Sequence, residues 1–118
     1  MDFSNPLFHI PFGSGCIFIL LGLFQLKFPP KKINSIYGYR TSKSMLNQNR
    51  WNFAQKYASI QLIKIGFVLV LLSLLSIIYQ PNKEISILIG IVLLLTSVIT
   101  LILKVEKAID SKFKENNK

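Results

Sequence analysis

Acidic residues are scarce in this chain of 118 residues. No Asp or Glu occurs between Asp2 and Glu84, and the whole sequence has only five acidic residues against fourteen Lys and Arg, which gives a formal net charge of +9. Small proton-coupled transporters usually keep an ionisable acid within the membrane. The missing acids therefore argue against proton-coupled transport.

Cysteine and histidine are almost absent as well. The single cysteine, Cys16, excludes an internal disulfide scaffold and any CxxC metal pair. The single histidine, His9, is seven residues away, but no second His, Cys or acidic residue lies in the hydrophobic segments to complete a metal site or to orient a base. We therefore predict that the protein is not an enzyme and that it has no catalytic residue, no metal and no cofactor.

Apolar residues are abundant and fall in long blocks instead of periodic stripes. Hydrophobic residues make up 51% of the chain and charged residues 16%, and the mean hydropathy is +0.45. Three runs free of charge cover residues 6–26, 65–80 and 85–103, and the second run continues upstream through Lys64 to Ile60. Each run can cross about 30 Å of hydrocarbon. Buried helices of a soluble bundle would need a polar face, which the third run lacks.

These runs predict an all-α integral membrane protein with three transmembrane helices and a single membrane domain over residues 1–118. The spans are expected at about 6–28, 59–80 and 85–104. The first run is interpreted as a retained helix and not a cleavable signal, because its lysine-rich stretch follows the apolar core. The last dozen residues, within a tail over 105–118, are expected to be frayed and solvated.

Charge asymmetry predicts the orientation. The connection over residues 29–58 is rich in cations, so the positive-inside rule places it in the cytoplasm. The segment Gln80–Glu84 is then an external turn, the N-terminus is outside and the C-terminus is cytoplasmic. The cations of the first connection and the start of the second span are Lys27, Lys31, Lys32, Arg40, Lys43, Arg50, Lys56 and Lys64.

The connection is expected to end in a helix. Pro29 and Pro30 stop the first helix, Thr41, Ser42 or Ser44 can cap the next one, and no proline follows until Pro81. A helix over residues 44–79 would be about 54 Å long, so its first half is predicted to be a cytoplasmic juxtamembrane helix that continues into the second span. One packed face is expected to hold Asn47, Trp51, Ala54 and Ala58.

Aromatic residues accompany these cations, a mixture that could grip single-stranded nucleic acid. Beside an apolar span the same mixture is typical of a headgroup belt, in which rings lie at the interface and cations contact anionic lipid. We expect the lipid bilayer with anionic headgroups as a partner, and no nucleic acid. The expected lipid-phosphate contacts are Lys31, Lys32, Lys43, Arg50, Lys56 and Lys64.

Small residues recur within the spans at packing distances, and small residues let membrane helices approach closely. They are Gly15, Gly22, Gly66, Ser73, Ser76, Ser86 and Gly90. A specific helix interface and the ordinary composition of membrane helices both explain them, and the formation of an oligomer stays open.

Between residues 32 and 57 the sequence also resembles a known motif. Its matching residues are Lys32, Ile33, Asn34, Tyr37, Gly38, Tyr39, Arg40, Thr41, Ser44, Met45, Asn47, Trp51, Ala54, Gln55 and Tyr57. This string resembles the motif of the SdpI family, membrane immunity proteins against the SdpC-derived sporulation-delay toxin of Bacillus-type bacteria. The chain is similar to a short form with one motif and three spans.

The resemblance implies a multi-pass protein of the bacterial cell membrane that protects the producing cell against a secreted peptide toxin. Some members of the family also capture a cytoplasmic repressor at the membrane, so the resemblance implies such a repressor as a further partner. Arg40 is the residue we expect to recognise a phosphate, a carboxylate or helix-end carbonyls, and Trp51 the residue that anchors the juxtamembrane helix. A purely structural role of the motif, and a signalling or scaffold module that recruits a partner through its basic face, remain as alternatives. A holin-like pore is a third, but the spans offer few residues for a polar stripe.

Overall fold

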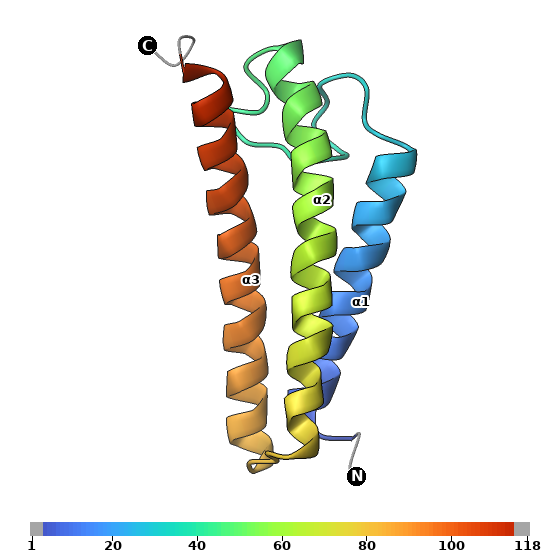
Figure 1. Cartoon of the computed structure of the whole chain (residues 1–118), viewed down its shortest axis with the longest axis vertical. Helices are drawn as coiled ribbons and strands as arrows, with labels where there is room; N and C mark the ends of the chain where they lie inside the picture. The colour runs from blue at the N-terminus through green and yellow to red at the C-terminus, as the bar shows by residue number, and fades with distance from the viewer. Residues whose placement is uncertain (1–3, 115–118) are drawn as a thin grey trace.

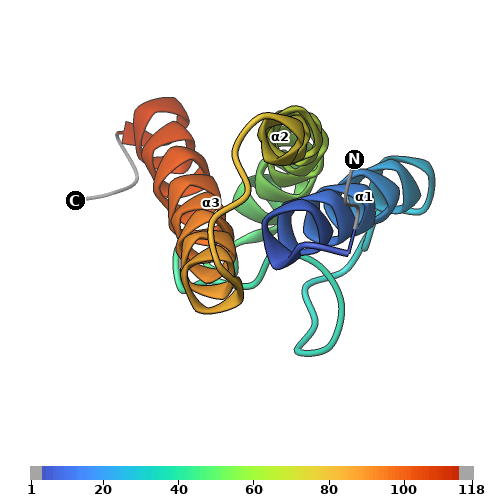
Figure 2. The same ribbon diagram turned by 90° about the horizontal axis from the view of Figure 1, so that it is seen from below.

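The computed structural model describes residues 4–114, and all regular structure in this part of the chain is helical. Helix α1 runs over Pro6–Lys27, α2 over Gln48–Ser73, the 3-10 turn η1 over Leu74–Ile77 and α3 over Lys83–Lys112. Consecutive helices are antiparallel, and a short turn joins α2 to α3 (Figure 1). Seen end on, each helix lies beside the other two (Figure 2). The all-α prediction with three apolar helices is confirmed.

All three α-helices begin after an asparagine. The side-chain oxygens of Asn5, Asn47 and Asn82 accept hydrogen bonds from backbone N–H groups of the first turn, at 2.8–2.9 Å. Such caps satisfy donors that the helix itself leaves open. Pro6 follows the first cap at a position where its missing N–H costs nothing.

The prediction that Thr41, Ser42 or Ser44 caps the second helix is wrong. Helix α2 begins four residues beyond Ser44, after Asn47. The reason is a separate local structure, in which the Thr41 and Ser44 side chains hydrogen-bond each other's backbone N–H groups at 2.9 and 3.2 Å. Asn47 is consequently a cap and does not belong to the packed face with Trp51.

Close approach of α1 and α2 depends on glycine. A Cβ atom built on Gly15 would lie 2.6 Å from the carbonyl oxygen of Gly66, and one on Gly66 would lie 2.6 Å from that of Gly15. One built on Gly22 would lie 2.7 Å from the Ser59 carbonyl. The structure therefore favours a specific helix interface over ordinary membrane composition as the reason for these small residues.

Helix α3 is buried near its two ends. Ser86 and Gly90 are buried near its start, Val105 and Ile109 near its finish, and none of its residues between Gly90 and Val105 is buried. Val105 and Ile109 pack with Ala54 and Ala58 of α2 in one apolar cluster.

The expectation that the last dozen residues are frayed is therefore wrong for residues 107–112, which belong to α3. Residues 105–112 are helical because Val105 and Ile109 recur on one face and find an apolar partner surface. Residues 115–118, which complete that predicted tail, lie outside the described part.

The bundle is longer than a bilayer is thick. Its principal extents are 51 × 29 × 21 Å, whereas the hydrocarbon core measures about 30 Å. All three helices are long and apolar enough to cross a membrane, and large hydrophobic side chains cover their outer surfaces, including Leu20, Leu71 and Leu95. The three apolar helices are those of a multi-pass membrane protein, and the bundle is longer than the apolar layer.

A methyl group at Gly15 should loosen the bundle, whereas the same methyl at Gly13 should not. Gly15→Ala pushes the Cβ against the Gly66 backbone, and overpacking of this kind costs about 1–3 kcal/mol. A Cβ on Gly13 meets nothing within 4 Å, so Gly13→Ala is the matched control. Thermal unfolding in detergent, followed by circular dichroism, should show a lower midpoint for Gly15→Ala alone. Equal midpoints for the two variants would contradict the close contact.

Candidate functional site

Residues 28–47 form the connecting segment between α1 and α2, and they fold against one end of the bundle (Figure 1). The segment contains turns and bends but no regular helix. Backbone N–H and C=O groups outside regular structure still need hydrogen-bond partners when they are withdrawn from water. Those partners come from α2 and from the segment itself, whereas α3 binds side chains of the segment.

One face of α2 supplies side chains that bind the backbone of the connecting segment. Trp51 is fully buried, and its indole N–H donates to the Pro30 carbonyl at 2.6 Å. The amide of Gln55 is 3% exposed and makes two bonds with one residue: its nitrogen donates to the Tyr39 carbonyl, and its oxygen accepts from the Tyr39 N–H, both at 2.7 Å. Gln48 donates to the Lys31 carbonyl at 2.6 Å.

Two turns shape the segment between these contacts. The Asn34 side chain accepts from the backbone N–H groups of Ile36 and Tyr37 at 2.9 and 2.7 Å and closes a tight turn. Gly38 then has φ of 105°, and a Cβ there would lie 2.5 Å from the Gln55 side-chain oxygen. Only glycine accommodates both the positive φ and this contact.

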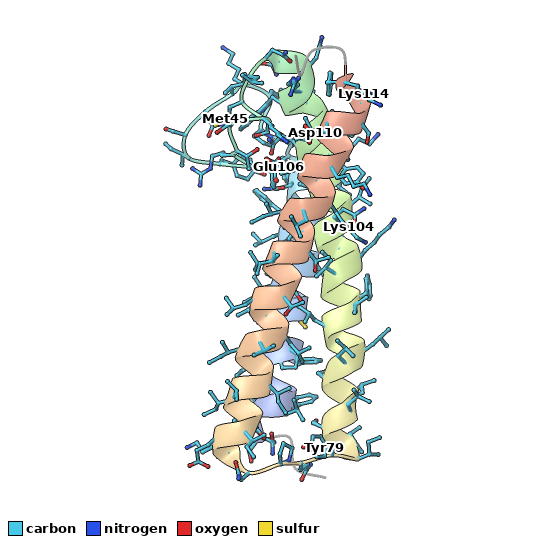
Figure 3. The ribbon with its side chains drawn as sticks, turned by 90° about the vertical axis from the view of Figure 1, so that its left-hand side faces the viewer. Met45, Tyr79, Lys104, Glu106, Asp110 and Lys114 are labelled. Carbon is cyan, nitrogen blue, oxygen red and sulfur yellow. The ribbon has the colours of Figure 1, made fainter. Side chains whose placement is uncertain are left out.

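Helix α3 binds the far part of the segment through two acids one turn apart. Glu106 Oε2 accepts from the Tyr39 hydroxyl and from Thr41 Oγ1, each at 3.0 Å. Asp110 forms an ion pair with Lys43 at 2.6 Å, with both side chains more than 40% exposed. Figure 3 shows Glu106 and Asp110 at the end of the bundle that carries the segment with Met45, opposite Tyr79.

Burial, together with the hydrogen bond and the negative charge of Glu106, raises the pKa of Tyr39 well above its ordinary value of 10.0. The Tyr39 hydroxyl is therefore protonated at every physiological pH and remains a donor. Burial also raises the pKa of Tyr37, whose hydroxyl donates to the Phe28 carbonyl at 2.7 Å.

Ser44 and Arg40 complete the segment's own contacts. Ser44 is fully buried, and its hydroxyl lies 3.1 Å from the carbonyl oxygens of both Tyr39 and Thr41. Arg40 is exposed, and its guanidinium donates to the Ser35 carbonyl. Arg40 and Asn34 therefore both stabilise the surface loop over residues 34–40.

Trp51 is fully buried, in agreement with its predicted place on a packed face. Two other expected positions differ from the sequence interpretation. Arg50 is not at the headgroup surface: it is 1% exposed, and its guanidinium lies 5.4 Å from the Phe113 ring centroid. Tyr57 stacks on Phe53 at 5.6 Å and so belongs to an aromatic cluster that is separate from the connecting segment.

The other expected lipid contacts remain on the surface. Lys31, Lys32, Lys56 and Lys64 are exposed, and Lys43 is half-buried in its ion pair. Their contact with phosphate stays a prediction.

Glu106, Asp110, Gln48 and Phe113 were not expected at the site. The signal that could have found the two acids is their spacing: they are four residues apart on a helix that also carries Val105 and Ile109, next to a connection with no acid of its own. In the stretch 4–114, no group of His, Cys, Asp and Glu could hold a metal ion. The polar groups of the motif mainly bind one another and the backbone. The site therefore holds the backbone of the connecting segment in one conformation.

Replacing Gln55 should release the connecting segment while the helices remain. Gln55→Ala leaves the Tyr39 N–H without its partner and leaves the Tyr39 C=O with the Ser44 hydroxyl alone, and a buried polar group left unsatisfied costs about 1–3 kcal/mol. Hydrogen exchange in detergent should therefore speed up at residues 38–40 but not in the middle of α2. Asn49→Ala, at an exposed position of the same helix, is the control. Unchanged exchange at Tyr39 would contradict the role of Gln55.

Comparisons with known proteins place this arrangement in a family. The SdpI/YfhL protein family matches residues 31–104, which include most of the connecting segment, all of α2 and most of α3. The protein YfhL of Bacillus subtilis (strain 168), itself described as uncharacterized, is 44% identical over 61 residues, or 52% of this chain. Those residues cover 56% of YfhL, so the match spans about half of that relative. No solved structure matches. The chain therefore belongs to the SdpI/YfhL protein family.

Proposed function

We propose that this protein is an immunity protein of the bacterial cell membrane, which protects the cell that makes it against a secreted peptide toxin. The observation that carries the proposal is the family match over residues 31–104, which contains the motif. The contact network supports it, because Gly38, Tyr39 and Gln55 of the motif contact one another, and Asn34 fixes the turn that precedes them.

The toxin would meet the protein mainly within the bilayer. In the proposed orientation the connecting segment is cytoplasmic, and among the described residues the outer side presents mainly Ser4, Asn5 and the turn at residues 78–82. The Pro81 carbonyl of that turn is already hydrogen-bonded within the protein, because it accepts from Ser86 at 3.1 Å and from Asn5 at 3.4 Å. The apolar outer faces of the helices offer much more surface, and a peptide toxin inserted in the membrane would contact those faces.

A signalling or scaffold module is the second candidate, and one surface feature favours it. A cavity of about 720 Å³ opens between α2 and the end of α3, lined by Phe53, Tyr57, Phe113, Lys56 and Lys112 among others. Aromatic rings with flanking cations suit the capture of an acidic segment of a cytoplasmic partner such as a repressor. In this alternative the protein signals instead of neutralising a toxin.

Single-cysteine labelling tests the orientation. Because Cys16 is the only cysteine, a Cys16→Ser background can carry either Lys32→Cys or Lys83→Cys. In intact cells a membrane-impermeant maleimide should label Lys83→Cys, and it should reach Lys32→Cys only after permeabilisation. The reverse pattern would invert the orientation and move the proposed partner surfaces to the outside.

Protection can be measured in sensitive Bacillus cells that lack their own immunity protein. Cells expressing the chain should keep their membrane potential when the sporulation-delay toxin is added, as read with a potential-sensitive dye. Arg40→Lys should lose protection, because an ammonium lacks the planar fork of the guanidinium. Lys83→Gln/Glu84→Gln, at the opposite end of the bundle, should retain it.

The two candidate functions give different results in this assay. Wild-type chain present at normal level in depolarised cells would refute the immunity role. A pull-down from detergent extract with wild type and Arg40→Ala adds the second measurement. If Arg40→Ala loses protection while partner capture is normal, the scaffold alternative loses its support.

A further inference from the structure

A second cavity, of about 460 Å³, lies where the end of α1, the connecting segment and the start of α2 meet. It is separate from the aromatic cavity, although both border Asn52 and Lys56. The walls that matter here are Gln25 and Leu26 of α1, Pro30 and Lys31 of the segment, and Asn52 and Lys56 of α2.

The charge lining this cavity is entirely positive. Lys31 of the connecting segment and Lys56 of α2 both line it, and no acidic residue is among its lining residues. The first turn of α2 contains no acid either, so the positive end of that helix is not neutralised by its own side chains. The cavity is therefore suited to an anion.

The side-chain amides in its wall are oriented as donors. The Gln25 oxygen faces Ser59 Oγ at 3.0 Å, and the Asn52 oxygen accepts from Gln48 at 2.7 Å. What Gln25 and Asn52 offer a ligand is consequently the NH₂ group. Two ammonium groups and two amide donors match the oxygen-rich acceptor surface of a phosphate.

The position of the cavity along the bundle, at the end of the apolar spans, favours a lipid as the source of that phosphate. The first uncharged run ends at Leu26 and the first cation is Lys27, so the cavity lies at the boundary between hydrocarbon and water. Leu26 and Pro30 give it an apolar wall, and Leu23, one turn deeper on α1, is half exposed. An acyl chain can follow this flank below a headgroup held by the lysines.

We propose that this cavity binds the headgroup phosphate of an anionic phospholipid such as phosphatidylglycerol. Lys31 and Lys56 contact the phosphate oxygens, Gln25 and Asn52 donate hydrogen bonds to it, and the acyl chains lie along Leu23 and Leu26. The proposal does not depend on the immunity function or on which side of the membrane the segment faces.

Native mass spectrometry of the full chain in a neutral detergent tests this site. Titration with dioleoylphosphatidylglycerol should show one lipid bound more tightly than dioleoylphosphatidylcholine. Lys31→Gln/Lys56→Gln should weaken phosphatidylglycerol binding about tenfold or more, since each lysine near a phosphate contributes on the order of a fivefold factor. Lys31→Arg/Lys56→Arg should retain the binding, which separates charge from any loss of folding.

The control variant removes the same charge outside the cavity. Lys32→Gln/Lys64→Gln should change the affinity by less than about threefold, because neither residue lines the cavity. Equal weakening by both double variants would overturn the proposal in favour of diffuse attraction. Displacement of the lipid by glycerol phosphate at comparable concentration would also overturn it, because the ligand would then be a soluble phosphate.

Discussion

The arrangement of this protein depends on how α2 satisfies the backbone of the connecting segment. A segment without helix or strand at the edge of a membrane has many peptide groups that need partners. Gln48, Trp51 and Gln55 supply them from one side of α2, at intervals of three and four residues. The two hydrogen bonds between the Gln55 amide and the Tyr39 backbone resemble those that a neighbouring β-strand would make. The path of the segment therefore follows from the position of a single helix face.

Helix α3 fixes the other side of the segment, and its packing explains why the acids are where they are. Ala54 and Ala58 are small, so Val105 and Ile109 can approach α2 closely. Because of this contact, α3 remains helical beyond the end of its uncharged run. Glu106 therefore lies beside Tyr39 and Thr41, and Asp110 lies beside Lys43. A connection with no acid of its own thus receives its negative partners from a distant part of the sequence.

Much of this architecture could be predicted from the sequence, because long uncharged runs have few alternatives. The spans and the stop at Pro29 and Pro30 follow from local patterns, whereas Gly38 and Gln55 were singled out by the resemblance to the family motif. The start of α2 could not be predicted, since serine, threonine and asparagine are all good caps and only the fold shows that Thr41 and Ser44 bond to each other. The helical end of α3 was not predicted, because the lysine-rich composition of the tail indicated a solvated segment although Val105 and Ile109 have helical spacing.

The burial of Arg50 shows what a helical wheel leaves out. The first turns of α2 have three sides: Trp51 and Gln55 bind the connecting segment, Arg50 and Ala54 are covered by the end of α3, and Asn52 and Lys56 border open cavities. A wheel separates these sides but does not say which of them a third helix will cover. Only cations on the uncovered side remain available to phosphate, so Lys56 can contact lipid while Arg50, six residues earlier on the same helix, lies against an aromatic ring.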